Sequence, residues 1–405
     1  MTQLPVPAPT DVEAWVEDHL LHLSADERVD RSPRFVGTQA AADDALTALD
    51  ISGYARRRSE VLPESARGAS GLSPYIRHGM LTLPAVSQAV GAAPSKDRQK
   101  FRDELMWQEY ARHVYARLGT RTARSLRFAP PARTGGASGV EPWDRSMACI
   151  DATVGELERD GWLVNQTRMW LASQWTVRHG ADWRVGEDRF FTHLLDGSRA
   201  ANRLGWQWTI GAGTGKPYGF SRWQVEKRAP GLCARCPHRH DCPIEHWPDE
   251  RSLAEEAPDD RLRRDLDPDR TAGPTAAPTT GGADTIWLTA ESLGDDDPAL
   301  AAHPELPVVF VFDEPLLARL RLASKRLVFL ADRLAELASR RPVELHLGDP
   351  GVVLAGRALA TTFTPVPKGR ALRHGLHVAE LHPWPWLVRP NAGSIESFSA
   401  WRRSR

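Results

Sequence analysis

The sequence is poor in cysteine, in net charge and in long apolar runs. It has four cysteines in 405 residues, and its 52 basic residues are matched by 52 acidic ones. The zero net charge gives no overall attraction to nucleic acid, although a local basic groove would still bind phosphate. No apolar run reaches the about 18 residues that a membrane-spanning helix needs. The N-terminus, MTQLPVPAPTDVEAW, lacks the basic and apolar regions of a signal peptide, so we expect a cytoplasmic monomer without membrane contact.

Tryptophan and the clustering of the cysteines stand out against this background. There are 15 tryptophans. A tryptophan-rich helical core explains some of them, whereas electron transfer through indole rings, or stacking on bases or a flavin, is the functional interpretation. Three of the four cysteines fall in the run Cys233-Ala-Arg-Cys236 and Cys242-Pro. In a cytoplasmic protein such clustering favours a metal site over disulfides.

Composition and periodicity divide the chain into four parts. Residues 1–251 are mostly helical in pattern, with a flexible loop over 129–142. Residues 252–284 are rich in Asp, Arg, Pro and Gly and predict a flexible linker. In residues 285–389, apolar runs such as LPVVFVFD alternate with helical patterns, including one long helix over 317–340. This alternation predicts a small doubly wound α/β domain, and residues 390–405 form a C-terminal tail.

Two segments carry the most informative motifs. GASGLSPYIRHGMLT (68–82) places a Gly and Ser turn before a helix start, where hydroxyls and free N–H groups suit an anion, although a simple capped helix fits equally well. FFTHLLDGSRAANRLGWQWTIGAGTGKPYGFSR (190–222) resembles the flavin-cradling segment of photolyases and cryptochromes. FRDELMWQEY (101–110) and GWLVNQTRMWLAS (161–173) resemble further motifs of that family, and the motifs follow the family's order over roughly residues 35–228.

The resemblance implies that residues 1–251 form an all-helical FAD-binding domain, so that the chain is mainly α. Matched positions in the family hold the FAD phosphates (Ser70, Leu72, Ser73), form an ion pair across the isoalloxazine ring (Arg168 with Asp196) and face flavin N5 (Asn202). The full set of implied cofactor-binding residues is Tyr54, Ser70, Gly71, Leu72, Ser73, Gln108, Arg168, Asp196, Ser198 and Asn202.

The resemblance also implies a reaction. In photolyases, reduced FAD excited by light donates an electron to a pyrimidine dimer flipped out of DNA, and the dimer splits. Trp206 matches the tryptophan nearest the flavin in the electron-transfer chain, and Trp183 matches the next one. The implied lesion pocket, which would hydrogen-bond and stack on the dimer, consists of Glu104, Trp107, Asn165 and Met169. Damaged DNA is the expected partner.

Several departures from the family pattern keep other functions open. Gln108 and Gln166 stand where the family has arginines, and Ser198 stands where it has a second Asp. Val164 occupies the position of the catalytic histidine of (6-4) photolyases, which argues against that chemistry. A cryptochrome-like photoreceptor or redox signalling protein without repair activity is the main alternative. A relic that binds FAD and only stabilises a partner is the third.

The cysteines resemble those of the iron–sulfur bacterial cryptochromes and photolyases. Cys149 is the only candidate for a fourth ligand beside Cys233, Cys236 and Cys242, and it lies where that group carries one. The resemblance implies a four-iron, four-sulfur (4Fe-4S) cluster on these four thiolates. Zinc is the alternative, with a ligand supplied by His238, His240 or His246, and a site without metal stays open.

The order of the parts departs from the family. Its α/β antenna domain precedes the flavin domain, whereas here TIWLTAESLGDDDPALAA (285–302), which resembles the start of that domain, follows it. RPNAGSIESFSAWRRSR (389–405) resembles the segment that leads out of the antenna domain. We therefore expect a circular permutation. Both arginines of the opening motif are replaced, so we do not expect an antenna chromophore.

Overall fold

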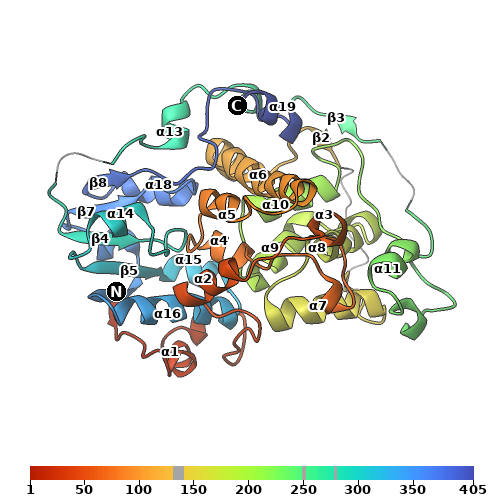
Figure 1. Cartoon of the computed structure of the whole chain (residues 1–405), viewed down its shortest axis with the longest axis horizontal. Helices are drawn as coiled ribbons and strands as arrows, with labels where there is room; N and C mark the ends of the chain where they lie inside the picture. Colours follow the sequence, from red (N-terminus) through yellow and green to blue (C-terminus); the bar gives the residue numbers. More distant parts are fainter. Residues whose placement is uncertain (131–140, 249–251, 278–280) are drawn as a thin grey trace.

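The computed structural model describes residues 1–130, 141–248, 252–277 and 281–405. Helices make up most of residues 39–228, in the centre and right of Figure 1, as the sequence predicts. They enclose a core that contains the fully buried Trp143, Trp170 and Trp206. These helices are α2 (Gln39–Thr47), α3 (Tyr54–Arg57), α4 (Ser73–Arg77), α5 (Leu83–Ala89), α6 (Ser95–Leu118), α7 (Ala148–Asp160), α8 (Asn165–Ser173), α9 (Trp183–His193), α10 (Ala201–Thr209) and α11 (Arg222–Arg228).

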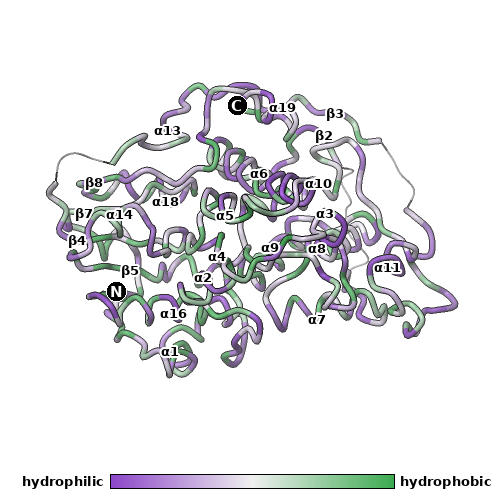
Figure 2. The backbone as a smooth tube through the Cα atoms, in the orientation of Figure 1, coloured by the Kyte–Doolittle hydropathy of each residue, from purple (hydrophilic) through white to green (hydrophobic). Residues whose placement is uncertain are grey.

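A six-stranded sheet fills the left of Figure 1, in the order β1-β6-β5-β4-β7-β8. Its strands are β1 (Thr2–Leu4), β4 (Thr285–Leu288), β5 (Val308–Asp313), β6 (Val343–Gly348), β7 (Leu359–Thr362) and β8 (Val378–His382). The five strands from β4 to β8 are parallel, which confirms the doubly wound pattern expected for residues 285–389. Apolar residues follow one another along β4 and β5 because both faces of these strands are buried (Figure 2).

Helices cover both faces of this sheet. The face that carries Phe310 and Phe312 packs with α14 (Pro298–Ala302) and α16 (Ser324–Ala338). The face that carries Val309 and Val311 packs against the segments of α17 (Pro350–Val353) and α18 (Pro367–Arg373). The predicted single helix over 317–340 is wrong, because α15 (Glu314–Leu320) ends at Arg321, whose φ of 48° is left-handed, before α16 begins.

The first residues of the chain belong with the sheet rather than with the helical part. β1 pairs antiparallel with β6, and α1 (Val12–His19) lies on α16 (Figure 1). Trp15 and Val16 are buried in the same core as the sheet residues. The predicted boundary at residue 1 of the helical domain is therefore corrected: the N-terminal segment crosses to the α/β part because its apolar side chains complete that core.

Two segments expected to be irregular are partly structured. The predicted linker 252–284 contains β3 (Ala254–Glu255), which pairs with β2 (Phe128–Ala129), and the helices α12 (Asp260–Arg263) and α13 (Pro268–Ala272). Leu262 is buried beside α6, and Asp265 pairs with Arg117 of α6 at 3.1 Å, so one apolar and one charged contact order this segment. Residues 278–280 of the linker and 131–140 of the predicted loop 129–142 lie outside the described residues.

The C-terminal tail is also docked. Residues 398–403 form α19 (Phe398–Arg403), which contacts α6 and buries Trp401. The Trp401 indole N–H donates to His113 Nδ1 at 2.8 Å, and this buried contact holds the tail in place.

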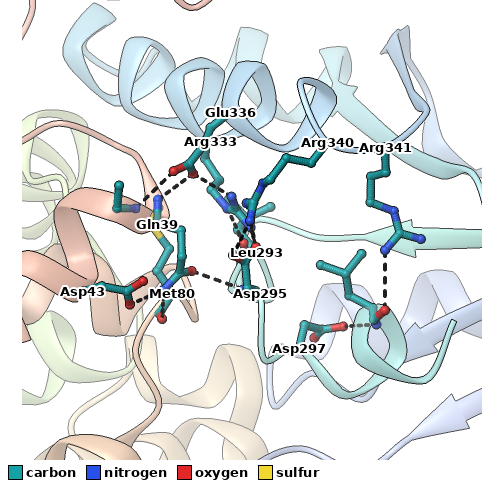
Figure 3. A network of polar contacts seen from close by, with 12 residues as sticks. Gln39, Asp43, Met80, Leu293, Asp295, Asp297, Arg333, Glu336, Arg340 and Arg341 are labelled. Atoms are coloured by element: carbon teal, nitrogen blue, oxygen red, sulfur yellow. Dashed lines mark hydrogen bonds and ion pairs between the residues drawn. The ribbon is translucent and has the colours of Figure 1, made fainter. Parts of the chain in front are cut away.

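A network of hydrogen bonds and ion pairs joins α2 to the α/β part (Figure 3). Arg333 of α16 is fully buried and donates to the Leu293 carbonyl at 2.6 Å and to Glu336 at 2.7 Å. Glu336 accepts from the backbone N–H of Gln39 at the start of α2. The two parts thus share a polar interface. Among the described residues, no helix is long and apolar enough to cross a membrane.

Candidate functional site

A cavity of about 1020 Å³ lies between the helical part and the α/β part. All of the predicted cofactor and lesion-pocket residues line it except Leu72 and Trp183. The α/β part contributes the carboxyl ends of β4 and β5, from Leu288 to Glu291 and from Phe310 to Asp313. Ligands of doubly wound sheets bind at this edge. The volume suits a dinucleotide-sized ligand with room for a second group.

The Gly and Ser turn lies at one wall of the cavity. Gly71 has a left-handed φ of 72°, which favours glycine, and α4 begins two residues later with Pro74 in its first turn. Ser70 is exposed, and Ser73 Oγ accepts a hydrogen bond from the Trp162 indole at 2.9 Å. The Leu72 side chain is fully buried in the helical core, so only its backbone is left for a ligand.

Arg168 and Asp196 form a two-pronged ion pair. Their atoms meet at 2.7 Å (Nη2 to Oδ2) and 3.1 Å (Nη1 to Oδ1), and both side chains are largely buried. Arg168 also donates to the side-chain oxygen Oδ1 of Asn202 at 3.3 Å, and this contact orients the side-chain amide. Asn202 Nδ2 is buried and has no hydrogen-bond partner. An unpaired buried N–H is costly, so this donor calls for an acceptor from a ligand in the cavity.

Trp206 lies on the cavity wall and is 2% exposed. Its indole N–H is also buried without a partner, and its ring meets Phe190 edge-on at 5.1 Å. A Cβ added to Gly186 of α9 would lie 2.2 Å from Trp206 and 3.0 Å from Trp175. Both indoles therefore lie too close to this position for a larger side chain. Trp175 in turn contacts Trp143 at 5.1 Å.

Trp183 is buried at the start of α9 but does not line the cavity. Its ring is covered by the Arg184 guanidinium at 4.9 Å. The sequence singled out Trp183 as the neighbour of Trp206 and missed Trp175. No motif shows that Trp175 and Trp206 both approach Gly186, because this depends on how the helices pack.

The predicted lesion pocket opens onto the same cavity. Glu104 of α6 is paired with Lys100 at 2.8 Å and lies 3.5 Å from Arg58. Trp107 stacks on Phe398 of α19, with ring centroids 5.3 Å apart and planes 15° from parallel. Phe398 does not itself line the cavity, so it supports one face of the indole. The sequence prediction gave Phe398 no role and placed it only in the C-terminal tail.

The remaining predicted residues differ in how deeply their side chains are buried. Asn165 is exposed at the start of α8, Met169 is half-buried one turn later, and both line the cavity. Gln108 lines it from α6, and Ser198 Oγ accepts from the backbone N–H of Ala200 at 3.1 Å. Gln166, which departs from the family's arginine, is buried outside the cavity lining and donates to the Tyr218 hydroxyl at 3.0 Å.

Basic residues of both parts meet at the cavity. Arg77 of α4 donates to Glu291 at 2.9 Å and to the Gly197 carbonyl at 2.8 Å. Arg326 of α16 donates to the carbonyls of Phe191 and Gly197, and burial, followed by repulsion from Arg77, lowers the pKa of its guanidinium to about 9. These arginines were absent from the sequence prediction because they act between the two parts.

The four cysteines line one small cavity away from the large one. It contains Cys149 of α7 together with Cys233, Cys236 and Cys242. The Cys236 sulfur accepts from the backbone N–H of Ala148 at 3.4 Å. Burial, and then the charge of the three other thiols, raises the pKa of Cys149 to about 12. Among the described residues, no three of these sulfurs lie within 4.8 Å of one another.

A two-pronged buried ion pair, an unpartnered amide and a Gly and Ser turn around one large cavity define a cofactor site on a helical scaffold. The comparisons with known proteins indicate which cofactor this site suits. Residues 101–227 match the family described as the FAD binding domain of DNA photolyase. The matched segment contains the lesion-pocket residues, Arg168, Asp196 and Asn202. The predicted FAD-binding domain is thereby supported.

Curated relatives that match the chain are named deoxyribodipyrimidine photo-lyases. The chain is 29% identical over 210 residues to the deoxyribodipyrimidine photo-lyase of Vibrio cholerae, a match that covers 46% of this chain and 43% of that protein. It is 32% identical over 160 residues to that of Synechococcus, covering 36% of this chain and 33% of the relative. The matches thus span less than half of each relative. They support placing this chain in the photolyase/cryptochrome family at the level of its FAD-binding domain.

Solved structures give a weaker likeness. A bacterial class III photolyase from Agrobacterium tumefaciens is 23% identical with a TM-score of 0.36, covering 50% of this chain and 41% of the other. A cryptochrome from Synechocystis is 22% identical with a TM-score of 0.44, covering 50% and 46%.

Proposed function

We propose that the protein is a light-driven, FAD-dependent photolyase that splits pyrimidine dimers in DNA. The observation that carries the proposal is that the flavin residues and the lesion-pocket residues line one continuous cavity. FAD, when bound, supplies the photoexcited electron donor. The buried, unpartnered N–H groups of Asn202 and Trp206 fit an acceptor in this cavity, and the helical segment matches an FAD-binding family.

Different residues of the chain would then bind the cofactor and the DNA lesion. The Gly and Ser turn at 70–73 would hold the phosphates, and the Arg168–Asp196 pair would lie against the ring system. Trp107, supported from behind by Phe398, would stack on the flipped bases with its free face. Glu104 would accept hydrogen bonds from the base edge through Oε2, since Lys100 and Arg58 both contact Oε1.

The decisive test is a repair assay on an oligonucleotide that contains a single thymine dimer, with the protein reduced and then illuminated or kept dark. We expect restored thymines in the light only. Trp107→Ala should weaken binding of the dimer DNA by about 1–3 kcal/mol, the value of one base stacked on an aromatic ring. Trp223→Ala is the matched control, because Trp223 is 62% exposed on α11 outside the cavity lining. A protein that carries flavin but restores no thymine would exclude repair.

The alternative, a cryptochrome-like photoreceptor or redox signalling protein, is favoured by one observation. Glu104 is already held by Lys100 and Arg58, and Gln108 replaces a family arginine on the same helix. A pocket whose acidic group is internally paired binds a neutral lesion less readily. Light-induced spectral change of the flavin, without repair and without affinity for dimer DNA over undamaged DNA, would select this function.

We further propose that the four cysteines hold a 4Fe-4S cluster. The shared cavity of Cys149, Cys233, Cys236 and Cys242 supports it. Around one tetrahedral zinc ion, with Zn–S bonds of about 2.3 Å, sulfurs lie about 3.8 Å apart, whereas no three of these sulfurs lie within 4.8 Å of one another. His238, a rival zinc ligand, is bonded to Ser146 at 2.8 Å. Iron and sulfide analysis after anaerobic purification tests this; equal iron in the wild type and in Cys236→Ala would refute it.

We also infer that the α/β part is the family's leading domain in permuted position. The parallel strands β4 to β8, which follow the helical part in the chain, support this. Its role would be to close the cavity. The absence of an antenna chromophore remains a prediction, which analysis of the extracted chromophores would test.

A further inference from the structure

Three side chains of the α/β part converge far along the chain from both sites above. Among the described residues, His303, Glu380 and His382 are the only group of three or more potential metal ligands whose ligand atoms all lie within 4.8 Å of one another. His303 Nε2 lies 2.6 Å from Glu380 Oε2, and His382 Nε2 lies 3.3 Å from the same oxygen. The two imidazole rings meet edge-on at 5.8 Å.

The fold brings them together in a simple way. Glu380 and His382 are two residues apart on the edge strand β8, so both side chains leave the same face of the sheet. α14 lies against β7 and β8 and ends at His303. Arg341 donates to the His303 carbonyl at 2.7 Å, while Asp297 caps the start of α14; Figure 3 shows both residues beside this helix.

A second observation points to a missing partner. The Glu380 side chain is 5% exposed, and its Oε1 atom is buried without any hydrogen-bond partner, while Oε2 faces both imidazoles. A buried carboxylate oxygen left unpaired is unfavourable unless a cation or a donor reaches it, and a cation bound by both oxygens of Glu380 would reach Oε1. The His382 side chain is 3% exposed, whereas that of His303 is 25% exposed, so the group opens to solvent on one side only.

We propose that His303, Glu380 and His382 form a binding site for a divalent transition-metal ion of the zinc type. Two imidazoles and one carboxylate are a known three-ligand set for zinc, which leaves a fourth position for water. Bonds of about 2.0–2.1 Å in a tetrahedron place ligand atoms about 3.3 Å apart, which matches the Glu380–His382 contact. The contact with His303 must open by less than 1 Å, and its half-exposed ring at the end of α14 allows this.

The site is independent of the flavin and of the cysteines. Its metal would join α14 to the edge strand β8, and the water position would face solvent. The rival explanation is an ion pair between Glu380 and two histidines that binds no metal.

Calorimetric titration of the full-length protein with Zn²⁺, after dialysis against a chelator, distinguishes the two. Wild type should bind one more zinc ion than Glu380→Gln, which keeps the shape of the side chain and removes its charge. His303→Gln changes a half-exposed residue at a helix end, so it keeps the sheet intact. Loss of a direct ligand should weaken binding by at least the about 10–100-fold that loss of an outer-shell partner costs.

His374→Gln is the matched control, because His374 is exposed on the same part of the molecule and outside the group. It should bind zinc like the wild type. Zinc bound by the cysteines is common to all of these proteins and cancels from the comparison, and Co²⁺ would identify it by the charge-transfer band of cobalt–thiolate bonds. Equal zinc affinity and stoichiometry in wild type, Glu380→Gln and His303→Gln would overturn the proposal.

Discussion

Two buried polar groups at the cavity wall of the helical part lack hydrogen-bond partners, whereas the buried arginine at the interface of the α/β part has them. At the cavity wall, Asn202 and Trp206 each bury an N–H without a partner. At the interface of the α/β part, Arg333 is equally buried, but its guanidinium bonds the Leu293 carbonyl, Asp295 and Glu336. Unpaired donors that line a cavity can bind the acceptors of a ligand, whereas a satisfied arginine holds two parts of the chain together. Substitutions in the two places should therefore separate cofactor binding from stability.

The largest effect should come from Arg168→Met. It leaves Asp196 buried without its partner, which costs about 3–5 kcal/mol of the free energy of unfolding, and it removes a wall of the flavin site. Urea titration and the flavin content of the purified protein measure both. The double variant Arg168→Met, Asp196→Leu should regain most of the stability but not the flavin. A single variant with normal flavin content would show that the pair does not contact the cofactor.

Arg333→Ala should lower the stability without loss of flavin. We expect a loss of about 3 kcal/mol in the free energy of unfolding, since Glu336 and the Leu293 carbonyl lose a buried donor, with unchanged flavin per folded molecule. Arg340→Ala is the control: Arg340 bonds the same Asp295, but its side chain is 46% exposed, so its removal should cost at most about 1 kcal/mol. Loss of flavin in Arg333→Ala would mean that the two parts are not separable.

Features that depend on residues close together in the sequence could be predicted from it. Arg168, Asp196 and Asn202 lie within short motifs, so their meeting at one site followed from the resemblance alone. The doubly wound strands were predictable because β5 is a continuous apolar run buried on both faces.

Contacts between distant segments could not be predicted. β1 is only three residues long, and its pairing with β6 leaves no periodicity to detect. Phe398 reaches Trp107 because Trp401 buries α19 against α6, and a tail that is short and mostly polar gives no sign of this. Leu262 is the buried leucine of a polar segment, and together with the Asp265–Arg117 ion pair it docks α12 on α6.

A smaller, pH-dependent effect should come from Glu109 of α6, which joins the helical part to the segment after β8. It is fully buried, and its Oε1 accepts from the Val388 N–H at 3.0 Å. Burial, opposed by Arg112, raises its pKa from 4.5 to about 7. The folded protein then binds more protons than the unfolded chain between these values, so stability is highest below pH 4.5 for this group and falls as the pH rises to 7.

The loss across that window should approach about 3 kcal/mol, at 1.36 kcal/mol per pKa unit. Glu109→Gln, which is neutral at every pH, should lack this contribution, and the difference between the two unfolding curves at pH 5 and pH 8 measures it. A difference that does not change with pH would place the pKa of Glu109 near its ordinary value.

The smallest effect on stability, about 1 kcal/mol for each variant, should come from replacing single tryptophans by phenylalanine. For these variants the informative measurement is the rate of light-driven flavin reduction. Trp206→Phe should slow it most, because Trp206 lines the cavity. Trp183→Phe and Trp175→Phe then decide between the route expected from the family and a route through Trp175, which approaches Gly186 as Trp206 does. Trp287→Phe is the control from the α/β part: Trp287 also lines the cavity, but it belongs to the wall that we take to close the site rather than to conduct. If Trp287→Phe slowed reduction as much as Trp206→Phe, electron transfer would not be confined to the helical part.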